Sequence, residues 1–320
     1  MTTDTKTPKA ADAAERPPNA TAPPPRPQAK SWTGLWFVLP FAAMYVLFLV
    51  WPTVLGLYYS FTDKSLTGRP ASWIGLDNWA EALGDERAWD ALWNTAEFTV
   101  YSSVPLVIIA LVMALLVNRA RRMGWFLRMS FFAPFILPVS VVTMIWIWMY
   151  QPDGGLINDF LQNTLGIQDA SEPTLWLSDE GTAMWSVVIT TVWWTVGFNF
   201  LLYLAALQTI PKDVYEASSM DGANWWQQLR GITLPLLKRT TALVIVLQLI
   251  ASLRIFDQMY LMTGGGPNRA TEVAIHYIYI TGFEGYRIGY ASALSYVLFV
   301  LIMIVSIVQF RLFSRKEDQA

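Results

Sequence analysis

Long apolar blocks alternate with short polar connections along most of this 320-residue chain. Six of the blocks are long enough to cross a membrane, since about 30 Å of hydrocarbon takes about 20 helical residues. Each block is apolar on every face instead of alternating with a period of two, so the pattern predicts membrane-spanning helices and no strands. The predicted spans are residues 34–59, 95–117, 130–150, 183–207, 241–262 and 289–310.

The two ends of the chain lie outside this pattern. The first thirty residues contain seven prolines and no aromatic residue, a composition that buries too little apolar surface to order itself. The apolar block that follows is longer than the apolar core of a signal peptide and lacks a cleavage site of small residues, so it is interpreted as a retained span. We expect a disordered tail over 1–31, a six-helix membrane domain over 32–313 and a short tail over 314–320.

The basic residues lie mostly on one side of the predicted helices. Sixteen Lys and Arg residues fall in the two tails and in the connections near 119–128 and 212–239, whereas five fall in the other connections. The positive-inside rule then places both termini in the cytoplasm. One further basic residue, Arg254, lies within a predicted span.

The composition argues against most soluble enzymes. Hydrophobic residues make up 54% of the chain and charged residues 14%, against about 25% charged residues in typical soluble domains. The absence of cysteine excludes disulfides, thiol catalysis and cysteine metal sites. The single histidine, His276, argues against a histidine zinc site and is interpreted as a structural or surface residue. A net charge of −2 offers no basic face for nucleic acid, so no nucleic-acid partner is expected.

The connection at 151–182 is acidic and falls on the outer side by the charge count. It carries six Asp and Glu residues and no basic residue. Apolar residues recur there at helical spacing, at Leu156, Ile157, Phe160, Leu161 and Leu165. We expect a short amphipathic helix on the outer face of the membrane.

The cytoplasmic connection at 211–236 has the composition of a docking element. Asp213 follows Pro211 by two residues, a position that favours the start of a helix, and a turn is expected at Gly222. Pro235 is expected to interrupt the chain before the fifth span. Four further side chains give the loop an apolar side that neither lipid nor water explains: Tyr215, Trp225, Trp226 and Leu229. The interpretation is two short helices that bind another protein.

A motif within this connection resembles the EAA loop of ABC importer permeases. That family pattern is Glu-Ala-Ala-x-x-x-Gly, then nine residues, then Ile-x-Leu-Pro. This chain has Glu216-Ala217-Ser218-x-x-Asp221-Gly222, then nine residues, then Ile232-x-Leu234-Pro235, with Ser218 in place of the second alanine. A second stretch, Phe256-Asp257-x-x-Tyr260-x-x-Thr263-x-Gly265-Gly266-Pro267 followed by Thr271, is similar to the segment after span five in binding-protein-dependent carbohydrate permeases of the maltose and glycerol-3-phosphate class.

The resemblance implies a fold, a location and a set of partners. The fold would be the all-α transmembrane subunit of a type I ABC importer, with six helices, in the cytoplasmic membrane of a bacterium. Such permeases pair with a second permease, dock on two ATPase subunits and receive solute from an extracytoplasmic binding protein. The implied ATPase-docking residues, with Glu216 and Gly222 central, are Glu216, Ala217, Ser218, Asp221, Gly222, Ala223, Ile232, Leu234 and Pro235.

The chain lacks a nucleotide site of its own. No G-x-x-x-x-G-K-[ST] sequence, the loop that cradles phosphates, occurs in it. We therefore expect no catalytic residue, no metal and no cofactor on this chain, and ATP with Mg²⁺ on the partner ATPase.

Polar groups within the spans are candidates for a solute path, because charges there are costly. Arg254 and Asp257 are three residues apart and either neutralise each other on one helix face or border the path. Asn199 and Gln248 either bond across helices or meet substrate hydroxyls. Rings near Asn199 that could contact a sugar include Trp194 and Tyr203. In addition, Pro134 and Pro138 are expected to break span three, and Gly197 thins span four.

The leading functional hypothesis is a permease subunit for a sugar or sugar-like solute. Another polar solute, such as glycerol phosphate or a polyamine, is the alternative within transport; a phosphate would favour basic residues in the path, and only Arg254 qualifies. An integral-membrane enzyme would need clustered His, Asp or Glu, which the chain does not have. A stand-alone ion-coupled transporter would need carboxylate relays within the membrane and would have no use for the EAA-like loop.

Overall fold

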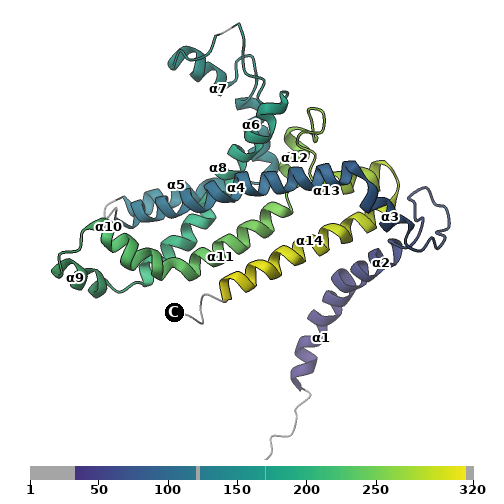
Figure 1. Ribbon diagram of the computed structural model, residues 1–320, viewed down its shortest axis with the longest axis horizontal. Coiled ribbons are helices and arrows are strands. Elements are labelled where there is room, and N and C mark those ends of the chain that lie inside the picture. The colour runs from purple at the N-terminus through teal and green to yellow at the C-terminus, as the bar shows by residue number, and fades with distance from the viewer. Residues whose placement is uncertain (1–32, 120–122, 170, 315–320) are drawn as a thin grey trace, which may run out of the picture. The chain divides into compact units, whose positions relative to one another are not determined.

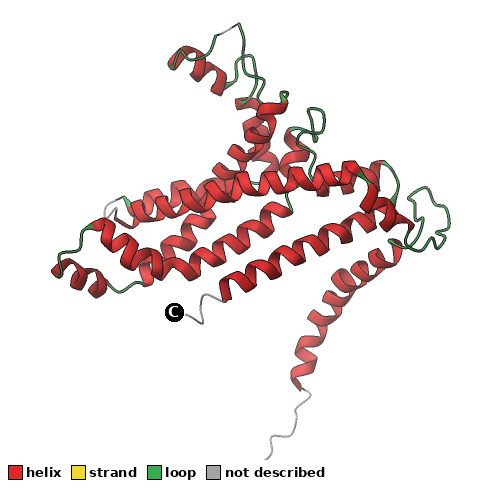
Figure 2. Cartoon of the chain, viewed as in Figure 1, coloured by secondary structure: helices red, strands yellow, loops and turns green. Residues whose placement is uncertain are grey.

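The computed structural model describes residues 33–119, 123–169 and 171–314. The predicted tail over 1–31 and nearly all of the one over 314–320 lie outside these residues. Figure 2 shows helices joined by loops, and the strand-like pairing within the described residues is one isolated bridge between Thr62 and Trp73. The predicted all-helical class is confirmed.

Residues up to Pro52 and residues from Thr53 onward form two compact units. The first contains α1 (Thr33–Tyr45), a π-helical turn (Val46–Val50) and the start of α2 (Trp51–Tyr59). From Trp36 to Tyr59 these elements form a stretch of 24 residues that is long and apolar enough to cross a membrane. This stretch coincides with the first predicted span.

The second unit contains the remaining helices, several of them longer than the spans predicted for them (Figure 1). They are α3 (Asp77–Gly84), α4 (Glu86–Arg119), α5 (Gly124–Ile136), α6 (Val139–Met149), α7 (Leu156–Asp159), α8 (Glu180–Thr209), α9 (Lys212–Met220), α10 (Trp225–Gln228), α11 (Leu234–Leu253), α12 (Asp257–Met262), α13 (Ala274–Tyr279) and α14 (Ile288–Ser314). The expected short helix near 156–165 is present as α7 and a following π-helical turn (Phe160–Thr164).

The third span is a bent pair of helices. α5 and α6 meet at an angle of 97°, and together they pass the length and hydropathy test for a span. Leu137 has extended backbone angles and Pro138 caps α6, as expected for a residue that precedes a proline. The predicted break is present at Pro138, whereas Pro134, which was also expected to break the span, lies inside α5. The described residues thus hold five straight candidate spans, or six if the bent pair counts as one.

The fifth predicted span, 241–262, is wrong at both ends. Its helix begins at Trp225 and runs through a π-helical turn (Leu229–Thr233) to Leu253, so Pro235 does not interrupt it. The Leu234 N–H bonds to the Leu229 carbonyl, five residues back, and Pro235 follows at the first turn of α11, where its missing N–H costs little. At the other end the helix stops at Leu253, and the chain restarts as α12 at Asp257.

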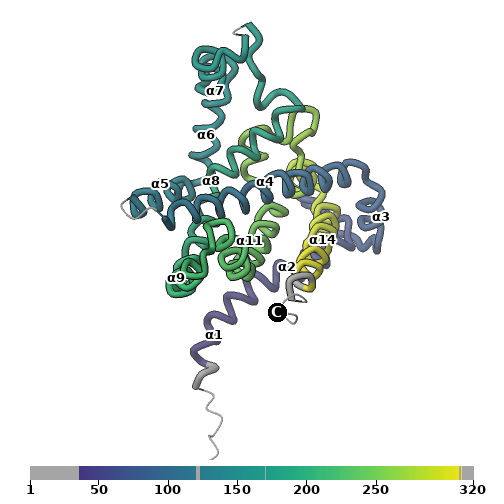
Figure 3. Tube along the Cα trace, turned by 60° about the vertical axis from the view of Figure 1, so that its left-hand side comes forward, coloured from purple at the N-terminus to yellow at the C-terminus, as the bar shows by residue number. Residues whose placement is uncertain are grey.

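Helix α8 is the centre of the packed core. It lies against α4, α5 and α11 (Figure 3), and its residues Val196, Phe200 and Leu204 are buried among them. α4 contributes Ala110 and Ala114, both fully buried. Small residues let helix backbones approach closely in a membrane, where packing rather than water exclusion drives helix association.

A polar cluster joins Asp85, the residue directly before α4, to side chains of α13 and α14. Asp85 accepts hydrogen bonds from the Tyr277 hydroxyl at 2.6 Å and the Tyr290 hydroxyl at 2.5 Å. Burial raises the pKa of the Asp85 carboxyl, but these hydrogen bonds outweigh it and hold the pKa below its ordinary value. The carboxylate therefore stays ionised and keeps its bonds over the physiological pH range.

Gly197 marks the closest approach between α8 and α5. A Cβ at this position would lie 2.2 Å from the Phe131 carbonyl oxygen and 2.9 Å from the Phe132 Cα, so neither backbone can accommodate it. We expect Gly197→Ala to destabilise the protein by about 1–3 kcal/mol, the usual cost of overpacking, and to lower its melting temperature in detergent.

Gly84→Ala is the matched control for this prediction. A Cβ at Gly84 meets no atom within 4 Å, so its effect should stay within about 0.5 kcal/mol. Equal melting temperatures for Gly197→Ala and the unaltered protein would contradict the close contact.

Candidate functional site

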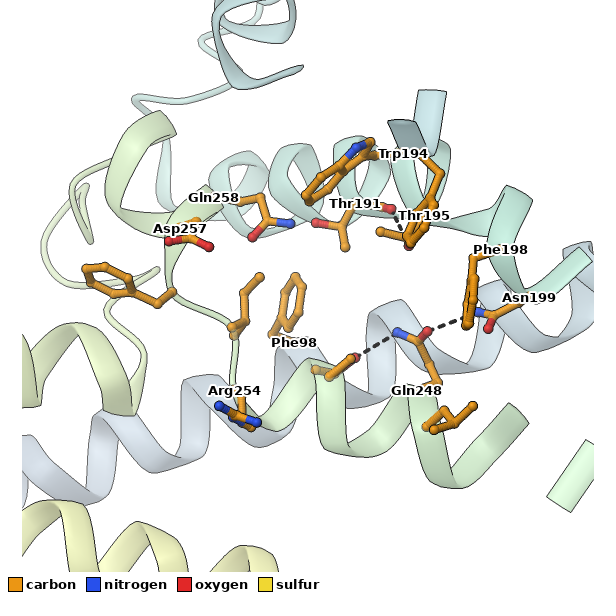
Figure 4. Close-up of a pocket in the computed structure, with 16 residues that line it drawn as sticks. Phe98, Thr191, Trp194, Thr195, Phe198, Asn199, Gln248, Arg254, Asp257 and Gln258 are labelled. Carbon is orange, nitrogen blue, oxygen red and sulfur yellow. Dashed lines mark hydrogen bonds between the residues drawn. The ribbon is translucent and has the colours of Figure 1, made fainter. Parts of the chain in front are cut away.

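A cavity of about 330 Å³ lies beside α8, at the break between α11 and α12 (Figure 4). α4 and α5 each contribute one phenylalanine to its wall. The lining residues are Phe98, Phe135, Thr191, Trp194, Thr195, Phe198, Asn199, Leu247, Gln248, Ala251, Ser252, Arg254, Ile255, Phe256, Asp257 and Gln258.

Aromatic rings form much of the wall. Phe135 of α5 stacks on Phe198 of α8, with ring centroids 5.2 Å apart. The Trp194 indole N–H donates to the Leu137 carbonyl at 3.2 Å, which fixes the orientation of that ring. Rings held in this way offer flat apolar surfaces, which suit the apolar face of a sugar.

Asn199 and Gln248 are bonded to each other across two helices. Asn199 Nδ2 donates to Gln248 Oε1 at 3.0 Å, and Gln248 Nε2 donates to the Ser252 hydroxyl at 3.0 Å. That hydroxyl lies 3.1 Å from the hydroxyl of Ser102 on α4. The two amides are nearly buried, with 2% and 7% of their surface exposed. They therefore join α8, α11 and α4, and of the two roles considered from the sequence the geometry favours helix-to-helix bonding.

Arg254 and Asp257 do not form the intrahelical pair considered from the sequence. The helix ends at Leu253 and resumes at Asp257, so the two residues do not share a helix face. Both are among the described residues, and no ion pair joins them; Figure 4 shows their side chains apart. Each is exposed at the cavity, which leaves two separate charges of opposite sign on its lining.

Gln258 is a cavity residue that the sequence analysis missed. It lines the cavity and is 6% exposed, and its amide bonds to no other residue in the part of the chain that the structure describes. By contrast, the Thr191 and Thr195 hydroxyls donate to carbonyls of their own helix. The only sequence signal for Gln258 was its place directly after Asp257, which is too weak to single it out.

Tyr203, a candidate path residue, lies elsewhere. Its side chain is fully buried in the core cluster with Phe200 and Leu204. Trp194, the other candidate ring, does line the cavity. The two rings are nine positions apart on α8, far enough for the helix to carry Tyr203 past the end of the cavity.

The connection 211–236 forms one short helix, α9, then the expected turn, and then the first turns of the long helix that begins at Trp225, so the second short helix expected there is not a separate element. Pro211 precedes α9, and the chain turns at Gly222, whose φ is 82°. That angle lies in the left-handed region that Gly adopts without strain. α10 then begins with a capping box, in which Asn224 and Gln227 each accept from the other's backbone N–H.

Side-chain bonds hold this hairpin to the long helix. The Tyr215 hydroxyl lies 2.9 Å from the Thr233 hydroxyl, and Gln228 Nε2 donates to the Ser219 hydroxyl at 2.8 Å. The Arg119 guanidinium, at the end of α4, lies 4.8 Å from the centre of the Trp225 ring.

The face left open by these contacts carries most of the EAA-like residues. Glu216, Ala217, Asp221 and Gly222 are exposed, and Met220 beside them is 89% exposed. Ser218, Ala223 and Ile232 are half-buried, while Leu234 and Pro235 are exposed on the long helix. An exposed apolar and acidic face on a braced hairpin is typical of a protein-docking surface.

Comparison with known proteins identifies the family. Residues 106–318, about two thirds of the chain, match the model for the binding-protein-dependent transport system inner membrane component. The chain therefore belongs to that family. It is a multi-pass permease subunit of an ABC importer in the inner membrane, and it is not itself the ATPase.

Two curated relatives and one solved structure show how far the similarity extends. The chain is 36% identical over 279 residues to a sulfoquinovosyl glycerol transport system permease protein of Agrobacterium fabrum, covering 87% of this chain and 89% of that one. It is 32% identical over 288 residues to the sn-glycerol-3-phosphate transport system permease protein UgpA of Escherichia coli, covering 89% and 96%. The fold matches a bacterial ABC transporter involved in the import of alginate, with a TM-score of 0.77, 24% identity, and 89% and 96% covered.

The Asn199–Gln248 bond leads to a prediction about stability. Asn199→Leu would leave a buried amide oxygen of Gln248 without a donor, at a cost of about 1–2 kcal/mol. We expect Asn199→Leu and Gln248→Leu each to lower the melting temperature of the complex while the apparent substrate affinity is kept. The double variant should lose less than the sum of the two, because both changes break the same bond.

A different outcome for the melting temperature and the affinity would assign another role to Asn199 and Gln248. Unchanged melting temperatures together with weaker substrate affinity would mean that the two amides bind substrate and not each other.

Proposed function

We propose that this chain forms half of the translocation path for a sugar or sugar-like solute. The observation that carries this proposal is the cavity beside α8, which combines fixed aromatic rings with an amide, that of Gln258, that bonds to no other described residue. Rings can cover the apolar face of a sugar and an amide can bond its hydroxyls. The names of the relatives agree in class: one carries a sulfoquinovosyl glycerol, and one is a probable permease for starch degradation products.

The second half of the path and the energy source lie on other chains. A second permease subunit would complete the path, and an extracytoplasmic binding protein would deliver the sugar; one solved relative is described in complex with such a protein. Two ATPase subunits, each holding ATP and Mg²⁺, would dock on the hairpin at 211–236. Both termini of this chain lie in the cytoplasm in this arrangement, because the basic residues do, and lipid surrounds the remaining helix faces.

A sugar with an anionic group is the second candidate substrate. Arg254 places a guanidinium at the cavity with no ion-pair partner among the described residues, and a guanidinium binds sulfonate, phosphate or carboxylate strongly. Asp257 on the same lining weakens this preference, since it repels an anion. Uptake measured for neutral and anionic sugars side by side would separate the two substrate classes.

The cavity assignment predicts a defect specific to uptake. Gln258→Leu keeps the side-chain volume and removes a donor and an acceptor. We expect the apparent affinity for sugar in proteoliposomes to fall two- to tenfold, which corresponds to about 0.5–1.5 kcal/mol for a neutral hydrogen bond. The melting temperature should hold, since the amide makes no bond within the described chain.

Gln248→Leu is the comparison variant for this test. It makes the same change of side chain in the same cavity, but it is expected to lower the melting temperature and spare the affinity. Normal uptake kinetics for Gln258→Leu with every transported sugar would refute the proposed path.

The docking hairpin predicts a separate defect. Gly222 is exposed, and a Cβ there would meet no atom of the described chain within 4 Å. We expect Gly222→Trp to leave the protein inserted in the membrane but to lose the ATPase on purification, because the bulky ring blocks the approach of the partner.

Two control variants show whether loss of the ATPase is caused by the bulk of the Trp ring at the proposed interface. Gly222→Asn keeps a residue that tolerates a positive φ and should retain the ATPase. Gly68→Trp adds the same ring at the same φ of 82°, where a Cβ also meets no atom within 4 Å, but outside the hairpin, and it should retain the ATPase. Wild-type recovery of the ATPase with Gly222→Trp would exclude a docking contact at this turn.

A further inference from the structure

Neither the cavity nor the docking hairpin includes the segment 263–273, which joins α12 to α13. At its tip, Asn268 and Arg269 have φ angles of 45° and 66°, in the left-handed region that residues other than Gly rarely adopt. Two such residues in succession hold a conformation that the surrounding structure must impose. Backbone strain of this kind gathers at binding sites.

The base of the tip is fixed to α4. The Arg87 guanidinium donates to both carboxylate oxygens of Glu272, at 2.9 and 2.7 Å, and Glu272 is buried. Asn94 Nδ2 donates to the carbonyl oxygens of Arg269 and Glu272, each at 3.0 Å. Side chains of α4 therefore hold the backbone at Arg269 in place.

Two further contacts brace the segment. Asn268 Nδ2 donates to Glu180 Oε1, at the start of α8, at 2.5 Å. The Thr271 hydroxyl is buried and donates to the Gly266 carbonyl at 2.7 Å. These bonds brace the backbone of the tip, so the Arg269 side chain projects from a fixed backbone position.

Arg269 differs from the other basic residues on the predicted outer side. All five are described, and four of them have a partner: Arg87 with Glu272, Arg287 with Glu81 at 2.6 Å, Lys64 over the ring of Tyr59 at 5.8 Å, and Arg69 within electrostatic range of Asp63. The Arg269 side chain is exposed and makes no ion pair, side-chain hydrogen bond or ring contact with any described residue. Arg269 therefore carries a positive charge on a braced backbone, and this charge makes no contact that stabilises the described fold.

The segment that carries the tip begins close to the cavity. α12 begins with the cavity residues Asp257 and Gln258 and ends at Met262, one residue before the segment. Gly265 packs so closely on His276 that a Cβ there would lie 2.6 Å from the imidazole ring. The His276 ring in turn neighbours that of Phe256, another cavity residue, at 6.2 Å.

We infer that the tip formed by Asn268 and Arg269 is a docking contact for the extracytoplasmic solute-binding protein, with Arg269 bound to an acidic group on that protein. This inference rests on the proposed function, since it needs a binding protein as partner. A rigid tip loses little conformational freedom on binding, and an exposed charge steers a partner of opposite charge toward the site. A binding protein held there releases its sugar beside the cavity.

The test measures docking apart from sugar uptake. The complete transporter is reconstituted, and ATP hydrolysis is titrated with the purified binding protein of its own transport system. Arg269→Asn removes the charge and keeps a residue that tolerates positive φ; it should raise the half-saturating concentration of binding protein about tenfold. Arg269→Lys should keep most of the affinity, and the difference between Arg269→Asn and the unaltered protein should shrink as salt is raised.

Arg69→Asn is the matched control, an equal loss of charge on the same side of the membrane but in another loop. It should leave the half-saturating concentration unchanged, and all three variants should keep the melting temperature of the unaltered complex. An Arg269→Asn titration that overlays the unaltered one would overturn the inference. If the binding protein stimulates ATP hydrolysis through Arg269 but no sugar crosses, the proposed function fails and the docking contact stands. No stimulation of the unaltered transporter would overturn both.

A second measurement does not depend on affinity. The chain contains no cysteine, so Arg269→Cys carries one thiol that a maleimide-benzophenone reagent labels selectively. Illumination should cross-link this chain to the binding protein, and Met220→Cys in the cytoplasmic hairpin should give no such product. The absence of a cross-link from position 269 under saturating binding protein would also overturn the inference.

Discussion

Backbone N–H and C=O groups at membrane depth find no water, so each needs a partner inside the protein. The long helices meet this demand with their own hydrogen bonds, and the two places where the helices break must meet it in other ways. At the α5–α6 bend the Leu137 carbonyl accepts from the Trp194 indole. At the end of α11 the Arg254 and Ile255 N–H groups turn back to the Ala251 and Ser252 carbonyls. Irregular backbone at this depth is tolerated where it lines a cavity, and both breaks lie beside one.

The same constraint shapes the packing around α8. Without a strong drive to exclude water, helices in a membrane associate through close contact and interhelical hydrogen bonds. Gly197 brings two backbones together, and the chain of amides and hydroxyls from Asn199 to Ser252 ties α8 to α11 and α4. The wall of the cavity is therefore built from groups that also hold the bundle together. Only a few polar groups on it, the amide of Gln258 among them, remain available to a solute.

The sequence predicted the features that local chemistry determines. Proline restricts the backbone at its own position and at the residue before it, so the bend near Pro138 could be predicted. Gly222 indicated a turn because few other residues adopt its φ of 82°. The apolar blocks located the spans because a helix that crosses lipid must consist mostly of apolar residues. The fixed spacing of the EAA-like motif located the hairpin at 211–236, for which docking is proposed.

Features that depend on neighbouring helices could not be foreseen. The break after Leu253 falls in a stretch without Gly or Pro, so neither of the usual helix breakers marks it. The pairing considered for Arg254 and Asp257 required an unbroken helix. Pro235 was expected to interrupt the chain before the fifth span, but the helix continues through a π-helical turn that ends two residues before it. Whether an amide such as Gln258 is free is decided by what lies opposite it, which a single sequence does not record.

The π-helical turn has a mechanical consequence. The π-helical turn lets the helix run unbroken from Trp225 to Leu253, over 29 residues. At a rise of 1.5 Å per residue, this helix is a rod about 43 Å long. One end of this rod belongs to the hairpin at 211–236, and the other ends next to Arg254 on the cavity lining. A rod of this length that tilts by about 5° about one end moves the other by about 4 Å, more than the diameter of a water molecule. A small tilt of this helix therefore displaces the residues at its end on the cavity lining without unfolding a single turn of helix.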